Sequence, residues 1–260
     1  MVLTFHPHPS IVVGRRKDVS LLTTPDERAV LMGSLGIDFV ITYPFEQQTA
    51  ATSAMEFILL LKQHLNFSWL GVGQDFALGR SRQGNVNYLN SLSEVHAYDL
   101  KVFNPVELDG FVVSSSRIRE ALTRGDVVAA ARMLGRPYFV TGEVVVGDGR
   151  GRTLGIPTAN LSVDDKKLIP TSGVYACQAK LGIGSFAAAV NIGRRPTFHD
   201  DQALPWVEAH LLDFTGDLYG QTVQLEFVEY IREEQRFVGV EALIQQIKCD
   251  IQQTRDILRA

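Results

Sequence analysis

Hydrophobic and polar positions follow two different patterns along this chain of 260 residues. In the first half, short apolar runs rich in β-branched residues alternate with segments whose apolar residues recur at helical spacing. This alternation predicts a parallel sheet with helices on both faces. In the second half, strand-like runs dominate and turn residues separate them, which predicts a small antiparallel barrel.

Capping signals set the expected helices of the first half. Thr24–Glu27 and Ser53–Glu56 are both capping boxes, so helices should follow them and end near Gly36 and Leu65. Strands are expected between the helices, where apolar runs lie beside turn residues. The expected strands are Val2–Phe5, Ile37–Tyr43, Trp69–Gly73 and Ala97–Phe103, and the further expected helices are Asn85–Leu92 and Arg117–Thr123.

A change of pattern divides the chain after a short helix expected over Asp126–Leu134 and the sequence Gly135-Arg136-Pro137. We expect residues 1–125 to form one domain, residues 126–136 a linker helix and residues 137–260 a second domain. A final helix over Val240–Arg259 carries an apolar stripe that should pack on the barrel. The expected barrel strands are Tyr138–Val146, Gly173–Lys180, Ser185–Ile192, Trp206–Leu212 and Thr222–Tyr230.

Composition narrows the class of protein. Hydrophobic residues make up 45% of the chain and charged residues 21%, a balance typical of soluble globular proteins. The net charge of −4 argues against a general nucleic-acid binder, and no apolar run approaches the length of a membrane span. Cys177 and Cys249 match no metal spacing, so we expect both to be reduced in a cytoplasmic protein. The oligomeric state stays open.

The segment from Gly147 to Leu161 carries the densest chemical signal. Its glycines allow backbone N–H groups to converge on an anion, and its arginines suit phosphate oxygens. Thr158 and Asn160 point the same way in an extended segment, and their neutral oxygens suit Mg2+ when a substrate's phosphates bring the charge. A solvated hairpin is the alternative, since neither a P-loop nor a dinucleotide fingerprint matches. The candidate phosphate-binding residues are Gly147, Gly149, Arg150, Gly151, Arg152, Gly155, Thr158 and Asn160.

A strictly alternating strand presents a candidate catalytic carboxylate. Trp206, Glu208 and His210 share one face of this strand, and the apolar residues between them share the other. A carboxylate between an aromatic ring and a histidine can act as a general base toward a hydroxyl. The alternative is the exposed face of an edge strand.

A second Gly/Arg/Pro segment follows a strand at Asn191–Phe198. Its paired arginines, Arg194 and Arg195, suit a phosphate, and Phe198 suits an aromatic ring. A long basic hairpin is the alternative.

The first half offers candidates at expected strand ends, where ligands of parallel sheets bind. His6 and His8 follow the first strand and suit contacts to a nucleotide, because nothing nearby completes a metal site. Asp75 and Phe76 follow another strand. A third candidate combines hydroxyls, arginines and a helix N-terminus into an anion site, with a plain serine-capped helix as the alternative. Its residues are Ser114, Ser115, Ser116, Arg117 and Arg119.

Together these segments resemble the bacterial bifunctional riboflavin kinase/FMN adenylyltransferase family, also called FAD synthetase. The resemblance covers essentially the whole chain. Its kinase motifs are Gly147–Leu161, Gly173–Tyr175, Asn191–Phe198, Val207–His210 and Asp217–Gly220. Its adenylyltransferase motifs are Thr4–Pro9, Val72–Gly79 and Ser114–Arg119.

The resemblance implies ATP-dependent phosphorylation of riboflavin to FMN, in a Rossmann-like nucleotidyltransferase domain followed by a riboflavin kinase barrel with a C-terminal helix. Glu208 would activate the riboflavin 5′-hydroxyl, and Thr158 and Asn160 would hold Mg2+ on ATP. The glycine-rich loop would fold over the phosphates. The residues implied to close over the flavin are Asn191, Arg194, Arg195, Pro196, Thr197 and Phe198. Those implied to contact nucleotide or flavin in the other half are His6, His8, Asp75, Phe76, Ser114, Ser115, Ser116, Arg117 and Arg119.

One departure from the family concerns the start of the chain. The family has a strand and a His-x-Gly-His segment before the motif that begins here at Thr4. We therefore expect the parallel sheet to be incomplete and the adenylyltransferase half to be impaired. Two alternatives stay open: a longer, fully bifunctional gene product whose start is mis-assigned, and a flavin- or nucleotide-binding module without turnover.

Overall fold

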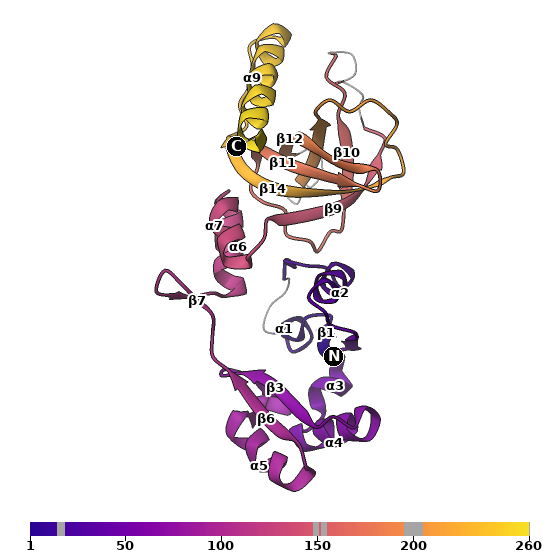
Figure 1. The fold of residues 1–260 in the computed structure, drawn as a ribbon, viewed down its shortest axis with the longest axis vertical. Coiled ribbons are helices and arrows are strands. Elements are labelled where there is room, and N and C mark those ends of the chain that lie inside the picture. Colours follow the sequence, from indigo (N-terminus) through magenta and orange to yellow (C-terminus); the bar gives the residue numbers. More distant parts are fainter. Residues whose placement is uncertain (15–18, 148–150, 152–154, 195–204, 260) are drawn as a thin grey trace. The chain divides into compact units, whose positions relative to one another are not determined.

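The computed structural model describes residues 1–14, 19–147, 151, 155–194 and 205–259. It divides into two compact units, Met1–Val113 and Ser114–Ala260. Strands and helices alternate in the first unit, and a β-barrel dominates the second (Figure 1). The helix Ser115–Thr123, expected in the first domain, and the helix Val127–Leu134, expected as a linker, both belong to the second unit. The functional limits 1–125 and 137–260 stay predictions.

Parallel strand pairs form the framework of the first unit. Strand β1 (Val2–His6) pairs with β2 (Val40–Pro44), and β3 (Trp69–Gly73) pairs with β6 (Asp99–Phe103). Both pairs are parallel because a helix-containing connection returns the chain to the end of the sheet where the first strand began. The predicted parallel arrangement is confirmed. Among the described residues, β1 is hydrogen-bonded to β2 and β3 to β6, as two separate pairs.

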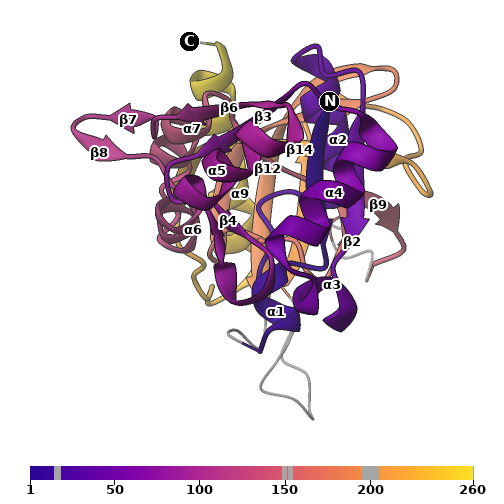
Figure 2. The ribbon, with the colours of Figure 1, turned by 90° about the horizontal axis from the view of Figure 1, so that it is seen from below.

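Helices and short hairpins complete the first unit. The hairpin β7–β8 projects from the strands of its own unit (Figures 1 and 2). The short helices α1 and α3 were not expected, because each is too brief to show helical periodicity. The helices are α1 (Pro9–Val12), α2 (Pro25–Ser34), α3 (Gln47–Ala51), α4 (Ala54–Leu65) and α5 (Val86–His96), with a 3-10 turn at Arg80–Arg82. The short strands are β4 (Ala77–Leu78), β5 (Gly84–Asn85), β7 (Glu107–Leu108) and β8 (Phe111–Val112).

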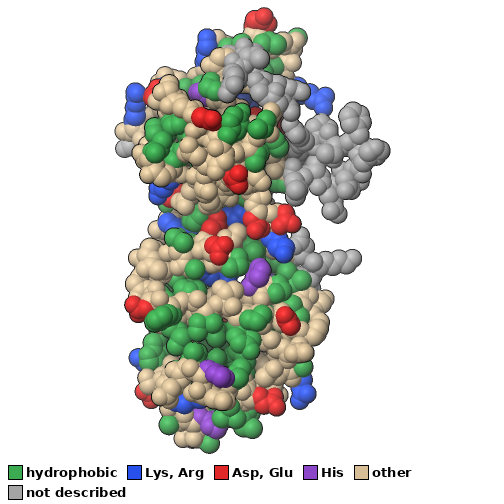
Figure 3. All heavy atoms as spheres, turned by 90° about the vertical axis from the view of Figure 1, so that its right-hand side faces the viewer, with side chains coloured by type: hydrophobic (Ala, Val, Ile, Leu, Met, Phe, Trp, Pro, Cys, Tyr) green, Lys and Arg blue, Asp and Glu red, His purple; other side chains and the backbone are tan. Residues whose placement is uncertain are grey.

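One hydrophobic core joins both strand pairs of the first unit to α4 and α5. Phe57 and Ile58 of α4 and Leu89 of α5 are buried in it, and Leu3 of β1 and Leu100 of β6 pack against it. Apolar side chains also lie on the surface of the chain, and Figure 3 shows them on the face that it presents. Most of the large exposed apolar side chains of the described residues belong to the first unit, among them Leu35, Phe39, Trp69 and Phe103.

The second unit begins with two helices, α6 (Ser115–Thr123) and α7 (Val127–Leu134), which pack against each other. Gly135 ends α7 in the left-handed conformation, with φ of 71°, which glycine adopts without strain. The first barrel strand starts at Tyr138, and the domain boundary expected at Gly135–Pro137 stays a prediction.

An antiparallel barrel forms the body of the second unit. Its strands close in the order β10-β13-β12-β11-β14-β9. Strand β10 adds to the five expected strands, and it was recognised only as an extended segment because it is short and follows the glycine-rich loop. The strands are β9 (Tyr138–Val145), β10 (Ala159–Val163), β11 (Gly173–Leu181), β12 (Gly184–Arg194), β13 (Pro205–Leu211) and β14 (Thr222–Arg232).

Alternating side chains fill the interior of the barrel. Tyr175, Val190, Ala209 and Phe227 are fully buried there, on four different strands. Cys177 is also buried, and burial raises the pKa of its thiol, so this free cysteine packs as an apolar group. The last helix, α9 (Val240–Arg259), packs on the outside of β11, β12 and β14, as its apolar stripe predicted (Figure 1).

We expect Ser53→Ala to lower the stability of the first unit by about 1 kcal/mol, the usual cost of losing a helix N-cap. The Ser53 hydroxyl accepts a hydrogen bond from the Glu56 backbone N–H at 3.2 Å, and the Glu56 carboxylate accepts one from the Ser53 N–H at 2.9 Å. Urea unfolding followed by Trp69 fluorescence measures the effect, in a Trp206→Phe background. Ser91→Ala, inside α5, is the matched control and should not destabilise; equal losses in both variants would contradict the capping role.

Candidate active site

Polar side chains from three neighbouring strands lie in one cross-strand row on the outside of the barrel. Glu208 of β13 lies opposite Asn160 of β10 on one side and opposite Asn191 of β12 on the other. Val207 and Ala209 point into the barrel, so alternation turns Glu208 outward. Directly opposed residues share a face, which makes Glu208 the centre of the row. Because β13 is paired on both sides, the alternative of an edge strand is wrong.

The Glu208 carboxylate is held by its neighbour on the same face. The Trp206 indole Nε1–H donates a hydrogen bond of 2.7 Å to Glu208 Oε1, and both side chains are half-buried. The orientation of the carboxylate is thereby fixed through one of its oxygens. The expected aromatic neighbour is therefore a hydrogen-bond donor to the carboxylate.

The third residue of this face, His210, contacts the segment that precedes the neighbouring strand β10. Its Nδ1 lies 2.8 Å from the carbonyl oxygen of Pro157, and since a carbonyl only accepts, Nδ1 must donate. His210 therefore fixes the segment that carries Thr158 and Asn160 to β13, rather than pairing with Glu208.

Asn160 has the features of a cation ligand. Its side chain is buried, and its Oδ1 has no hydrogen-bond partner in the part of the chain that the structure describes. A buried carbonyl oxygen left without a partner is costly, and a hard divalent cation accepts such an oxygen as a ligand. Gly147 lies directly against this side chain, since a Cβ built on it would be 1.9 Å from Asn160 Nδ2. The local structure thus reserves space for Asn160 and fits the metal expected with ATP.

The described parts of the glycine-rich loop lie beside Thr158. A Cβ on Gly151 would be 3.1 Å from Thr158 Oγ1 and 2.4 Å from the Ile156 carbonyl oxygen, and the Ile156 N–H donates to the Gly151 carbonyl at 2.9 Å. Gly155 adopts φ of 74°. Gly149, Arg150 and Arg152 lie outside the described residues. Gly147 and Gly151 therefore pack closely against Asn160 and Thr158, and their approach to an anion stays a prediction.

A cavity of about 330 Å³ opens beside Thr158. Its apolar wall includes Val144, Leu211, Phe214 and Leu218, and its polar groups include Asp217. A mostly apolar cavity with few polar groups suits a flat aromatic ring system. In the sequence, only the resemblance at Asp217–Gly220 indicated the loop after β13. The aromatic residue Phe214, close to Gly216, is the signal that could have extended this candidate segment toward β13.

On the other side of Glu208, β12 carries Asn191 and extends beyond the expected Ile192 to Gly193 and Arg194. Gly193 is buried, and a Cβ on it would be 2.6 Å from Glu234 Oε1, so the segment after β14 lies directly against this strand end. Arg194 ends the strand, and its side chain lies outside the described structure. The remaining flavin-side candidates, Arg195, Pro196, Thr197 and Phe198, also lie outside the described residues.

In the first unit, the candidates lie at carboxyl ends of parallel strands, as predicted. His6 ends β1, and His8 caps α1, where its Nδ1 accepts a hydrogen bond from the Ser10 backbone N–H at 3.2 Å. Asp75 follows β3, and its carbonyl accepts from Arg82 Nη2 at 2.9 Å. Phe76 packs against the hydrophobic core of the unit. Local structure accounts for these contacts, and ligand binding here stays a prediction.

The Ser114–Arg119 segment opens α6 in the second unit. The Ser114 hydroxyl caps this helix by accepting from the Arg117 backbone N–H at 3.4 Å, and Ile118 is buried. Ser115, Ser116 and Arg119 lie in the first turns of the helix. The geometry agrees with a serine cap, and the anion site remains a prediction.

The described residues contain no group of three or more His, Cys, Asp and Glu side chains placed to hold a metal ion. Across the same residues, no helix has the length and apolar character needed to cross a membrane. A metal at Asn160 and Thr158 would therefore depend on phosphate oxygens for most of its charge.

Comparisons with known proteins cover both units. A riboflavin kinase model matches residues 134–258, and a FAD synthetase model matches residues 1–117. The chain is 35% identical over 255 residues to the bifunctional riboflavin kinase/FMN adenylyltransferase of Listeria monocytogenes, covering 98% of this chain and 81% of the relative. It is 36% identical over 254 residues to the protein of the same name from Bacillus subtilis, covering 97% and 80%.

A solved structure has the same fold over nearly the whole chain. It is described as a macrolide-efflux protein from Streptococcus pneumoniae, with a TM-score of 0.88, 30% identity, and coverage of 98% of this chain and 83% of that one. The two family models together match both units, and the relatives match nearly the whole chain. The chain belongs to the bifunctional riboflavin kinase/FMN adenylyltransferase family.

Proposed function

We propose that this chain transfers the γ-phosphoryl group of ATP to the 5′-hydroxyl of riboflavin, with Glu208 as the general base. The observation that carries the proposal is the row Asn160–Glu208–Asn191 across three adjacent strands. It places a carboxylate between a cation-binding group and a second polar group. Phosphoryl transfer depends mainly on positioning and charge, which this row supplies.

The two flanks of Glu208 suit different substrates. On the β10 side, the apolar cavity beside Thr158 takes the adenine of ATP and leaves the phosphates near Asn160. Riboflavin then approaches from the β12 side, past Asn191 and Gly193, so that its hydroxyl and the γ-phosphate meet at Glu208. The attacking and leaving oxygens lie roughly in line in such a transfer, which requires substrates on opposite flanks.

Each described residue has a defined task in this transfer. Glu208 accepts the proton of the riboflavin hydroxyl, and Trp206 keeps its carboxylate oriented. Mg2+ held by Asn160, Thr158 and the phosphates would neutralise charge that develops on the phosphoryl group. His210 keeps Thr158 and Asn160 in place through the Pro157 carbonyl.

The second activity of the family, adenylyl transfer to FMN, is assigned here to the half that matches the FAD synthetase model. His6, His8, Asp75, Phe76 and the Ser114–Arg119 segment are its proposed contacts to nucleotide and flavin. A binding module without turnover is disfavoured, because binding alone does not require a general base, Glu208, directly opposite a cation-binding amide, Asn160.

Incubation with riboflavin, ATP and Mg2+, followed by chromatographic separation of riboflavin, FMN and FAD, tests both activities. We expect FMN to accumulate. Abundant FAD, in a preparation free of host enzyme, would show a working adenylyltransferase half and contradict the impairment expected from the sequence. If neither product forms while riboflavin still binds, the chain is a binding module and the proposed kinase activity is wrong.

Glu208→Gln should reduce the rate of FMN formation by about 10²–10⁴-fold, the range typical for loss of a general base. The amide keeps the shape of the side chain and can still accept from Trp206, so the fold should be retained. Glu143→Gln, an exposed carboxylate on β9, is the matched control and should keep the wild-type rate. Near-normal FMN formation by Glu208→Gln would contradict the assignment.

Asn160→Ala and Thr158→Ala should raise the KM for Mg-ATP more than the KM for riboflavin. Gly147→Ala should have the same effect, because its methyl group would occupy the space of the Asn160 amide. Steady-state kinetics with each substrate varied in turn measures the difference. Gly182→Ala, in the β11–β12 turn, is the control, since a Cβ there would meet no described atom within 4 Å. Unchanged ATP dependence in all three variants would make this segment a structural turn only.

A further inference from the structure

The row that contains Glu208 continues around the outside of the barrel. Beyond Asn191 it reaches Val174 of β11, and Val174 lies opposite Arg232 at the end of β14. Tyr175 lies opposite Tyr230, so Ile231 is an extra residue in β14, a β-bulge. A bulge changes which face the next side chain takes, and here it brings Arg232 onto the outer face.

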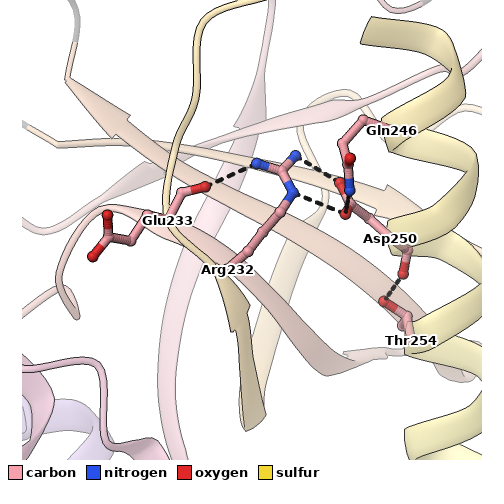
Figure 4. A network of polar contacts seen from close by, with 5 residues as sticks. All are labelled: Arg232, Glu233, Gln246, Asp250 and Thr254. Carbon is pink, nitrogen blue, oxygen red and sulfur yellow. Dashed lines mark hydrogen bonds and ion pairs between the residues drawn. The ribbon is translucent and has the colours of Figure 1, made fainter. Parts of the chain in front are cut away.

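An ion pair with α9 fixes Arg232 in this position. Its Nε and Nη2 donate to the two carboxylate oxygens of Asp250 at 2.9 and 2.7 Å, and its Nη1 donates to the Glu233 carbonyl at 2.8 Å (Figure 4). Asp250 is only 3% exposed and accepts a further hydrogen bond from Gln246 Nε2 at 2.9 Å. The guanidinium also lies 5.9 Å from the Phe237 ring. One side chain therefore organises the chain from Glu233 to Phe237.

This organised segment lies against the flavin side of the row. Glu234 follows the Glu233 carbonyl that Arg232 holds, and its carboxylate lies on Gly193, two residues after Asn191. Gly193 belongs to the Asn191–Phe198 segment that the proposed function assigns to riboflavin. A shift of Arg232 would therefore move Glu234 relative to this strand end.

We propose that Asp250 is a positioning residue for riboflavin, acting through Arg232 to hold the Glu233–Phe237 segment against Gly193. The proposal rests on the proposed kinase function, which assigns the β12 flank to the flavin. Asp250 was missed in the sequence because its partner is 18 residues away; the signal was a carboxylate beside the apolar stripe of α9.

Attachment of α9 to the barrel does not by itself require this pair. The apolar stripe already packs on β11, β12 and β14. A second bidentate pair, from Arg255 of α9 to Asp213 after β13, joins the same helix to the barrel with distances of 2.5 and 2.7 Å. A buried ion pair is in general weak evidence for net stability. The Arg232–Asp250 pair is therefore better explained by what it positions.

Asp250→Asn tests the proposal, because it keeps the volume of the side chain and removes its charge. Losing charge-assisted hydrogen bonds to Arg232 should raise the KM for riboflavin about tenfold and leave the KM for Mg-ATP within about twofold. Riboflavin affinity, measured by quenching of flavin fluorescence without ATP, should weaken in parallel. Asp250→Glu, which keeps the charge, should restore part of the affinity.

Asp213→Asn is the matched control, since it breaks the other bidentate pair of α9 by the same change of charge. It should leave riboflavin affinity unchanged. Equal loss of riboflavin affinity in both variants, or a parallel rise of both KM values in Asp250→Asn, would reduce the pair to a structural role and overturn the proposal.

If Asp250→Asn does not fold, Gln246→Ala provides the test. A rise in the KM for riboflavin alone supports the proposal, and an unchanged KM for riboflavin overturns it. Wild-type protein that makes no FMN would instead contradict the proposed function.

Discussion

Closure of the barrel by antiparallel hydrogen bonding is the constraint on which the kinase unit depends. Every strand has two neighbours, so register is fixed on both sides and side chains must alternate between interior and exterior. The interior takes apolar groups such as Tyr175 and Phe227. Polar groups on the same strands are thereby sent outward, where a row of opposed residues brings Asn160, Glu208 and Asn191 together. The same alternation of side chains therefore determines both the apolar interior and the polar site.

Local pattern was sufficient for the features that depend on one strand or one helix. The face of β13 that carries Trp206 and Glu208 followed from strict alternation, and both capping boxes are present in the structure. Strand β10 was less visible, because five residues after a glycine-rich loop show little periodicity. Strand β12 was recognised only as far as Ile192, yet it continues to Arg194, since glycine and arginine at its end obscured its length.

Pairing between distant strands could not be predicted in the same way. Nothing near Glu208 in the sequence indicates that Asn160 and Asn191 are its cross-strand neighbours, because register depends on the closed sheet as a whole. The bulge at Ile231 and the partner of Asp250 are likewise tertiary features. The first unit differs, since its candidates follow strand ends, a position that a strand-helix alternation already implies.

Asn191 and Glu208 lie on consecutive strands, whereas Asn160 lies on β10, which pairs with β13 across two intervening strands of the chain. A collapsed chain with correct secondary structure but without the β10–β13 pairing would lack the row. Pairings of long sequence separation form slowly, because chain entropy is lost before contacts are gained. Recovery of kinase activity after dilution from denaturant would therefore report on the β10–β13 pairing more directly than circular dichroism does.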